Sequence, residues 1–268
     1  MKIQIDITDF FFIMSQAILG FRLALQSRIQ EQLESAKTEL KNADIPRIRI
    51  QMFSDTVIAF CKLEIENPAG LFALSALLHA AGETMLRGLA SEISIRGGFD
   101  IHIATEFDNW VKSSGTEETY FVTPGDIWGP AMKRAYHLSE KTNSYPRIMI
   151  CRESMGFIER MLKCLEKNQK ISSSQRDLII KVARFIGNNL IIEDRIDGQL
   201  ILDYLNKDIA PYDSQIIRNL IKPAVEFVRK SYVRYTQEGN LILGPRYWQL
   251  LSYMESRRHP NGLVAPTD

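Results

Sequence analysis

The sequence predicts an α+β protein, with helices packed on a mostly antiparallel sheet and a mainly helical C-terminal extension. Two observations carry this prediction. Residues 1–151 alternate short β-branched or aromatic runs with helical patterns, in the order strand, helix, hairpin, helix, strand, loop, helix, strand. Residues 152–268 instead show three amphipathic helical patterns and one hairpin. We therefore expect two parts, 1–151 and 152–268.

The first elements follow from hydrophobic spacing and from chain breakers. IQIDITDFFF predicts a strand, and residues 11–43 predict a helix that Pro46 ends. The run IRIQMFSDTVIAFCKLE predicts a hairpin, because two apolar runs flank the turn dipeptide Ser54-Asp55. The run NPAGLFALSALLHAAGETMLRGL then predicts a helix with Asn67 as its N-cap.

The remaining elements of the first part are shorter. SEISIRGGFDIHIAT predicts a strand whose Gly-Gly pair marks a bend or a close backbone approach. Residues 105–125 are polar and predict mostly loop. PAMKRAYHLSEKT predicts a helix, and PRIMIC predicts a short strand after a proline.

In the second part we expect helices at about 153–169, 173–189 and 213–236. LIIEDRIDGQLILDYL predicts a hairpin that turns at Asp197-Gly198. Its acidic residues lack the loop length and further ligands of a calcium site, so we expect a solvated turn. Tyr247 and Trp248 are expected to be packing anchors or a dimer contact.

Composition excludes several classes of protein. The 268 residues are 45% hydrophobic and 24% charged, as in ordinary globular proteins. A net charge of +1 gives no basic field, so nucleic acid is not an expected partner. Three scattered cysteines favour reduced thiols and a cytoplasmic location over a disulfide framework or a zinc site. With no apolar run of spanning length, we expect no membrane span and no membrane partner.

Two carboxylates stand out as candidates for chemistry. Asp6 lies on the first predicted strand, and Asp55 lies in the hairpin FSDTVIAF. If the sheet brings them side by side, they would repel each other unless a divalent cation lies between them. A pair of such cations can stabilise the attacking and leaving oxygens of a phosphoryl transfer. The alternative from spacing alone is that Asp55 is a solvated turn residue.

The order of several sequence words resembles the class III nucleotide cyclases. DITDF at residues 6–10 is similar to the D-I-x-x-F opening of that family, in which the first metal-binding aspartate ends the first strand. The family's second metal-binding aspartate lies in the next hairpin turn, where this chain has Asp55. SIRGGFDIHIA, DIWGPAMKRAYHLSEK and PRIMIC then resemble the family's later segments. The resemblance covers about residues 1–151.

This resemblance implies a ferredoxin-like sheet and a head-to-tail homodimer whose active sites are built from both chains. It implies attack of a ribose 3′ hydroxyl on the α-phosphate of a nucleoside triphosphate, assisted by two Mn²⁺ or Mg²⁺ ions. It assigns Asp6, Ile7 and Asp55 to the metal site. It also assigns the backbone amides from Ile7 to Phe10 to the terminal phosphates of the substrate.

The chain departs from the family in the helix that carries the catalytic residues. The family has an asparagine that positions the ribose and, four residues later, an arginine that stabilises the transition state. Lys133 and His137 stand at these positions, and their spacing puts both on one helix face. We assign both as catalytic residues, and Arg96 as substrate-binding. Four arginines are candidates for the missing cation: Arg96, Arg134, Arg147 and Arg152.

The residues that select the base differ as well. Adenylate cyclases carry a lysine, and guanylate cyclases a glutamate, four residues before the second metal aspartate. Here Gln51 stands at this position, and its amide both donates and accepts, so it does not impose either purine. Asp126 matches the family's second base-reading position.

These selectors resemble those of the bacterial pyrimidine cyclases of Pycsar anti-phage defence. That branch makes cyclic UMP or cyclic CMP, which activates a separate effector. We therefore expect a pyrimidine nucleotide cyclase and favour UTP as its substrate. The alternatives are a cytidylate or purine cyclase, or a catalytically degenerate cyclase-like dimer that binds nucleotide without turnover.

Overall fold

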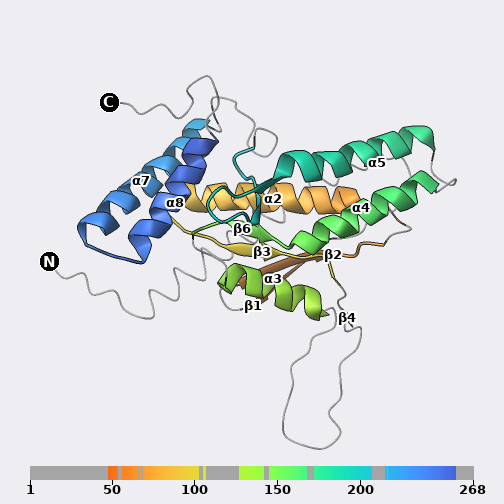
Figure 1. Cartoon of the computed structure of the whole chain (residues 1–268), viewed down its shortest axis with the longest axis horizontal. Coiled ribbons are helices and arrows are strands. Elements are labelled where there is room, and N and C mark those ends of the chain that lie inside the picture. The colour runs from red at the N-terminus through yellow and green to blue at the C-terminus, as the bar shows by residue number, and fades with distance from the viewer. Residues whose placement is uncertain are drawn as a thin grey trace, which may run out of the picture.

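The computed structural model describes residues 48–53, 56–64, 67, 69–102, 105–106, 127–141, 145–167, 172–206, 215 and 217–257. Within these ranges the protein is α+β, as the sequence predicts, with helices around small sheets (Figure 1). The described α-helices are α2 Gly70–Ala90, α3 Pro130–Lys141, α4 Arg152–Lys167, α5 Ser173–Phe185, α7 Lys222–Gln237 and α8 Leu243–Ser256. None of these helices combines the length and apolarity needed to cross a bilayer.

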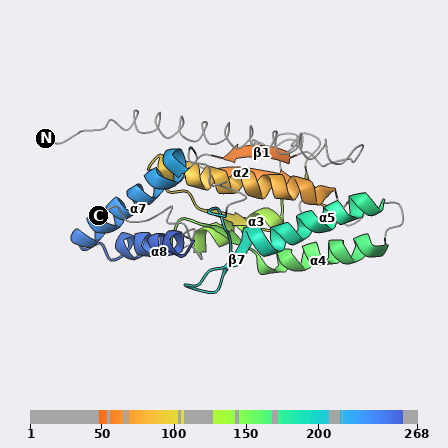
Figure 2. The same cartoon turned by 90° about the horizontal axis from the view of Figure 1, so that it is seen from above.

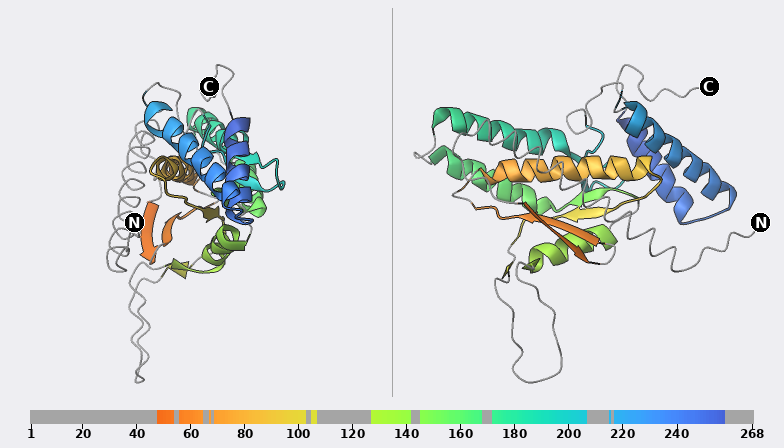
Figure 3. Two further views of the ribbon diagram at one scale, coloured as in Figure 1. Left: turned by 90° about the vertical axis from the view of Figure 1, so that its left-hand side faces the viewer. Right: turned by 180° about the vertical axis from the view of Figure 1, so that it is seen from behind.

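The predicted hairpin is confirmed as the antiparallel pair β1 (Ile48–Phe53) and β2 (Thr56–Cys61). Phe53 pairs with Thr56, so the two strands are joined by the two residues between them, which lie outside the described residues. The hairpin packs beside α2, as both views of Figure 3 show. This apolar contact places the two strands against the helical core.

A four-stranded sheet has the order β3-β6-β8-β7. Its strands are β3 Gly97–Phe99, β6 Ile148–Ile150, β7 Ile191–Glu193 and β8 Leu200–Leu202. β3 and β6 are parallel, whereas β8 is antiparallel to both β6 and β7. A separate two-stranded sheet pairs β4 Thr105–Glu106 with β5 Ile127–Trp128. The four-stranded sheet thus takes strands from both sides of residue 151, and the division of the chain there stays a prediction.

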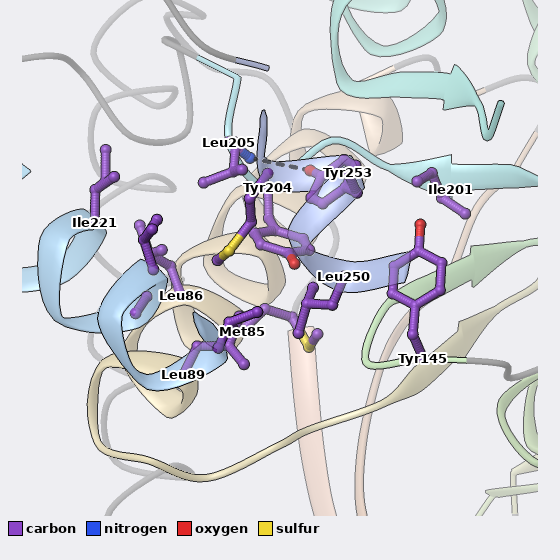
Figure 4. Close-up of a cluster of buried hydrophobic side chains, with 14 of the residues drawn as sticks. Met85, Leu86, Leu89, Tyr145, Ile201, Tyr204, Leu205, Ile221, Leu250 and Tyr253 are labelled. Atoms are coloured by element: carbon purple, nitrogen blue, oxygen red, sulfur yellow. Dashed lines mark hydrogen bonds between the residues drawn. The ribbon is translucent and has the colours of Figure 1, made fainter. Parts of the chain in front are cut away.

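Helix α2 contributes to two apolar clusters. Its first half, including Leu71 and Leu78, packs with residues of α4 and α5. Its second half, including Leu86 and Leu89, packs with residues of α7 and α8 in the cluster drawn in Figure 4. Figure 2 shows α4 and α5 toward one end of α2, and α7 and α8 toward the other. Burial along this one helix therefore connects the two ends of the described fold.

Some predicted boundaries were wrong. Asn67 does not cap α2, whose N-cap is Ala69. The backbone of Asn67 instead forms a bridge with Glu64, and its carbonyl accepts a bond from Gly70. The predicted strand around the Gly-Gly pair shrinks to the three residues of β3. Helix α8, which the sequence patterns did not mark as a helix, packs on α7.

The two C-terminal helical patterns also contain π-helical turns. Helix α5 ends at Phe185 and continues as η1 (Ile186–Leu190), and η2 (Ile217–Ile221) precedes α7. Ser172 begins α5 with a capping box, because its hydroxyl accepts from the Gln175 backbone while the Gln175 side chain accepts from the Ser172 backbone. The predicted hairpin that follows is confirmed as β7 and β8, with Gly198 at φ 70° in its turn.

The acidic turn of this hairpin is only partly solvated: Glu193 and Asp197 are exposed, as predicted, but Asp194 is not. Asp194 is buried, and both it and Asp197 accept hydrogen bonds from Arg147, which is fully buried beside β6. The Tyr145 hydroxyl donates to Asp194 at 2.6 Å, and the Arg147 guanidinium lies 4.7 Å from the centre of the Tyr145 ring. Arg147 therefore attaches the hairpin to the neighbouring strand.

Replacing Gly98 by alanine should destabilise the fold. An added Cβ would lie 1.9 Å from the Ala135 carbonyl oxygen of α3, so strand or helix must shift. Overpacking of this kind costs about 1–3 kcal/mol, or more when backbone must move. Urea unfolding measures the loss. The control Gly156→Ala on α4 meets only the Arg160 guanidinium at 3.8 Å and should not destabilise. Equal stability of the two variants would contradict the close contact.

Replacing Arg147 by methionine should lower the free energy of unfolding by about 3–5 kcal/mol, because it leaves the carboxylates of Asp194 and Asp197 without their cation. The control is Arg152→Met, since exposed Arg152 donates to the Gly198 carbonyl.

The ion pair between Arg147 and Asp197 should make the free energy of unfolding depend on pH. Burial opposes ionisation of Asp197, but hydrogen bonds from Arg147 hold its pKa below the ordinary value. A carboxyl whose native pKa is lowered stabilises the fold above its unfolded pKa of about 3.9, and this stabilisation is lost as the pH falls through the native pKa. Unfolding free energies measured from pH 6 to pH 2 should show this loss in the wild type and a smaller one in Arg147→Met.

Candidate functional site

Part of the predicted site can be located in the structure. Arg96, Lys133 and His137 are described, as is the backbone of Gln51, which pairs with Ile58 in the hairpin. The other predicted site residues lie outside the described residues: Asp6, Ile7, Phe10, Asp55 and Asp126. Within the described part of the chain, no group of three or more His, Cys, Asp or Glu side chains could hold a metal ion. The metal site therefore stays a prediction that rests on Asp6 and Asp55.

Helix α3, which carries Lys133 and His137, lies very close to β3. Gly98 permits this approach, because its missing Cβ leaves room for the Ala135 carbonyl. The helix begins after Gly129, whose φ of 147° suits glycine, and the Lys133 amide donates to the Gly129 carbonyl. The Gly-Gly pair noted in the sequence is thus a site of close backbone approach.

Helix α3 carries two predicted residues and one carboxylate that was not predicted. Lys133, His137 and Glu140 lie on one face of α3, at spacings of four and three residues. Arg96, just before β3, reaches the same face, because its guanidinium donates to Glu140 at 3.1 Å. Lys133 is exposed and His137 half-buried. We call this set of Arg96, Lys133, His137 and Glu140 the α3 stripe.

A second polar cluster holds the inner side of α3. Arg134 contacts three groups: the carboxylate of Asp100 with its Nε at 3.3 Å, Cys151 Sγ at 2.8 Å, and Glu153 Oε2 at 2.9 Å. Asp100 and Cys151 directly follow the parallel strands β3 and β6, so the cluster lies at the carboxyl ends of these strands. Ser154 adds a hydrogen bond to Asp100 at 3.1 Å.

The interactions in this cluster stabilise the ionised forms of Arg134 and Glu153. The hydrogen bond to Cys151, followed by the charge of Asp100, raises the pKa of Arg134. The hydrogen bond from Cys151 and the charge of Arg134 lower the pKa of Glu153. Arg134 is therefore ionised, and its guanidinium contacts Asp100 after β3 and Glu153 in α4. Its sequence neighbour Lys133 is exposed. We infer that Arg134 fixes the rotation of α3, and hence which way the α3 stripe faces.

These contacts distinguish the four arginines that could replace the family's catalytic cation. Arg147 is wrong as a candidate, because it is fully buried against Asp194 and Asp197. The guanidinium of Arg134 is bound to the inner cluster, and exposed Arg152 donates to the carbonyl of Gly198. Arg96 is half-exposed and bonds Glu140, one helical turn from His137, so it has the most suitable position.

Sequence reasoning missed the roles of Asp100 and Ser154. Asp100 is a polar residue at the end of a strand, which is a recognisable signal, but its partner Ser154 lies in the first turn of α4, 54 residues later. The Ser154 hydroxyl also accepts from the Ile101 amide at 2.8 Å. Only the parallel pairing of β3 and β6 brings these residues together.

Comparison with known proteins adds no assignment. A scan against family models matched no family, and searches of curated proteins and of solved structures found no match. The site is therefore interpreted from its own residues and from the family resemblance of the short sequence motifs in residues 1–151.

Thiol labelling should test the inner cluster. Burial, with hydrogen bonds to Glu153 and Asp100, raises the pKa of Cys151 to about 11, whereas Cys164 is exposed on α4. Because the thiolate is the reactive form, an aromatic disulfide reagent at pH 8 should label Cys164 rapidly and Cys151 slowly. The Cys151 rate should rise as the pH approaches 11. Cys164→Ser should remove only the fast phase, and a fast phase that persists when half-buried Cys61 is also changed to serine would contradict the cluster.

Proposed function

We propose that the protein is a metal-dependent nucleotide cyclase that converts a pyrimidine nucleoside triphosphate, UTP in preference to CTP, to a 3′,5′-cyclic monophosphate. The 3′ hydroxyl oxygen bonds to the α-phosphorus, its proton is released, and the bond to the pyrophosphate leaving group breaks. The product acts as a second messenger for a separate effector in antiviral defence. This proposal rests on the ordered sequence words of residues 1–151 and on the arrangement of α3.

The α3 stripe is the observation that carries the proposal. The family places two catalytic side chains one turn apart on this helix, and here Lys133 and His137 share a face there. Arg96 adds a third basic group toward one end of this face, because it bonds Glu140, which lies one turn from His137. Such a row can neutralise phosphate charge with Lys133 and Arg96 and donate a hydrogen bond from His137.

The remaining roles are assigned from the resemblance. Asp6, Ile7 and Asp55 hold two Mn²⁺ or Mg²⁺ ions, which supply Lewis-acid activation of the hydroxyl and stabilise the leaving group. Phe10 belongs to the loop that cradles the terminal phosphates, and Gln51 and Asp126 read the base. The hairpin supports this assignment, because Asp55 directly precedes in sequence Thr56, the first residue of β2, which pairs with Phe53 of β1. A homodimer completes each site with residues of both chains.

A second candidate is a cyclase-like dimer that binds nucleotide without turnover. It is favoured by His137, which replaces the family's permanently charged arginine, and by Arg96, whose guanidinium already bonds Glu140. Restoring the family residues with Lys133→Asn and His137→Arg separates the two candidates. A cyclase-like regulator would gain turnover from this pair, whereas the proposed enzyme would turn over before any substitution.

The decisive experiment incubates the full chain with each of the four ribonucleoside triphosphates and Mn²⁺, and identifies products by mass. We expect cyclic UMP. Asp6→Ala and Asp55→Ala should each lower the rate by more than about a hundredfold, because losing even an outer partner of a metal ligand costs 10–100-fold.

The matched control is Asp177→Ala, which removes an exposed carboxylate from α5 and should leave the rate unchanged. Product from a purine triphosphate alone would overturn the base assignment but keep the reaction. No product from any of the four, with nucleotide binding intact, would support the regulator instead.

A further inference from the structure

The connection between α7 and α8 gathers exposed apolar side chains. Six large hydrophobic residues are exposed among the described residues, and four of them surround this connection. These four are Val233 at 49% exposure, Leu241 at 89%, Ile242 at 64% and Trp248 at 51%. We call them the apical patch. Exposed apolar residues scattered singly need no explanation, but four around one turn indicate a binding surface.

The turn that presents Leu241 and Ile242 is held in a defined shape. Gly239 takes a φ of 64°, and the Asn240 side-chain oxygen accepts from the amides of Ile242 and Leu243 at 3.1 and 2.9 Å. The Gly239 and Asn240 amides donate back to carbonyls of α7, and the Gly244 amide donates to the Asn240 carbonyl. These amides therefore have partners within the turn, which lowers the cost of moving it into an apolar medium.

The patch lies at an end of the described fold. In Figure 1 the blue helices α7 and α8 form the left end of the ribbon, and Figure 2 shows them at the same end from above. Leu241 and Ile242 occupy the bend where one helix reverses into the other. The surface is thus a projecting bend between two helices and not a broad helix face.

The form and size of the patch disfavour a protein partner. Complete burial of the four side chains would hide roughly 500 Å², below the ~800 Å² that each partner buries in a standard protein interface. A bilayer needs no matching pocket, since its acyl region accepts any apolar side chain at shallow depth. Trp248 suits the boundary between headgroups and acyl chains.

The charge around the patch is complementary to an anionic lipid surface. From Glu226 to Trp248 the sequence carries four basic residues and two acidic ones, although the whole chain has a net charge of only +1. Glu226 and Glu238 pair with Lys230 and Arg234 on the exposed surface of α7, so the two other basic residues, Arg229 and Arg246, supply the excess positive charge. Basic residues beside an apolar tip strengthen binding to anionic headgroups.

We propose that the apical patch inserts into the surface of an anionic lipid bilayer, with Leu241 and Ile242 entering the acyl region and the basic residues of α7 and α8 at the headgroups. The proposal goes beyond the proposed cyclase activity and does not depend on it. The expectation of no membrane partner came from the lack of a spanning apolar run, and shallow insertion of a turn requires no such run.

The test is flotation of the full chain with vesicles of phosphatidylcholine and phosphatidylserine. Wild type should float with the vesicles, and Leu241→Ser combined with Ile242→Ser should lower the partition coefficient at least about tenfold, because the two largest exposed aliphatic side chains of the turn are lost. Asn240 is kept, so the turn retains its hydrogen bonds and the melting temperature should not change. The control Ile196→Ser changes an exposed aliphatic residue between β7 and β8 and should float as wild type does.

Two readouts distinguish a lipid from a protein occupant. Vesicles should shift the tryptophan emission of wild type to the blue, and Trp248→Phe should remove the shift. Light scattering without vesicles should give the same mass for wild type and the double variant. Wild type that does not float, or floats equally well with the double substitution, overturns the proposal. A change of mass in the double variant also overturns it, because the patch would then join copies of this chain.

Discussion

The ion pairs of Arg147 are the interaction on which the arrangement of the sheet depends. A fully buried guanidinium must have partners, and Asp194 and Asp197 supply them from the connection between β7 and β8. Arg147 itself lies directly before β6. One cation therefore joins a strand that lies before residue 151 with a hairpin that lies after it. Tyr145 completes the contact with its ring and its hydroxyl.

The position of helix α3 follows from this sheet. β6 holds β3 in parallel register, and Gly98 in β3 accepts the backbone of α3 at close range. Arg134 then ties the inner side of the helix to Asp100 and Glu153. The orientation of the α3 stripe is set by two contacts: a backbone contact at Ala135, on the opposite side of the helix, and the ion pairs of Arg134, on its flank. The orientation of the candidate active surface thus depends on contacts of Gly98, Ala135 and Arg134, and not on the side chains of the stripe itself.

Sequence patterns predicted this fold unevenly, for physical reasons. The hairpin at Ser54-Asp55 and the turn at Asp197-Gly198 were predicted because turn dipeptides act locally. The Asn67 cap failed because the backbone of Asn67 forms a local bridge with Glu64, three residues earlier, and the helix begins after Ala69 instead. The sequence predicted a solvated turn because no residue near it in sequence indicates its partner Arg147, which lies 47 residues before Asp194.

In the candidate site, too, local spacing was predicted from the sequence and long-range contacts were not. Spacing alone put Lys133 and His137 on one face, and the structure agrees. It could not pair Arg96 with Glu140, 44 residues away, nor bury Arg147. The residues that would settle the metal site, Asp6 and Asp55, lie outside the described part of the chain. Their assignment rests on sequence words and not on measured proximity.

The strand order β3-β6-β8-β7 also has a consequence for biosynthesis. Within this sheet, β6 has β3 available as soon as it leaves the ribosome, but its other edge waits for β8, about 50 residues later. During that interval an apolar strand edge and the Arg147 cation are both exposed. Unpaired edges are templates for association with other chains. Nascent chains whose synthesis stops between β6 and β8 should therefore depend on chaperones far more than chains that have been synthesised beyond Leu202, the last residue of β8.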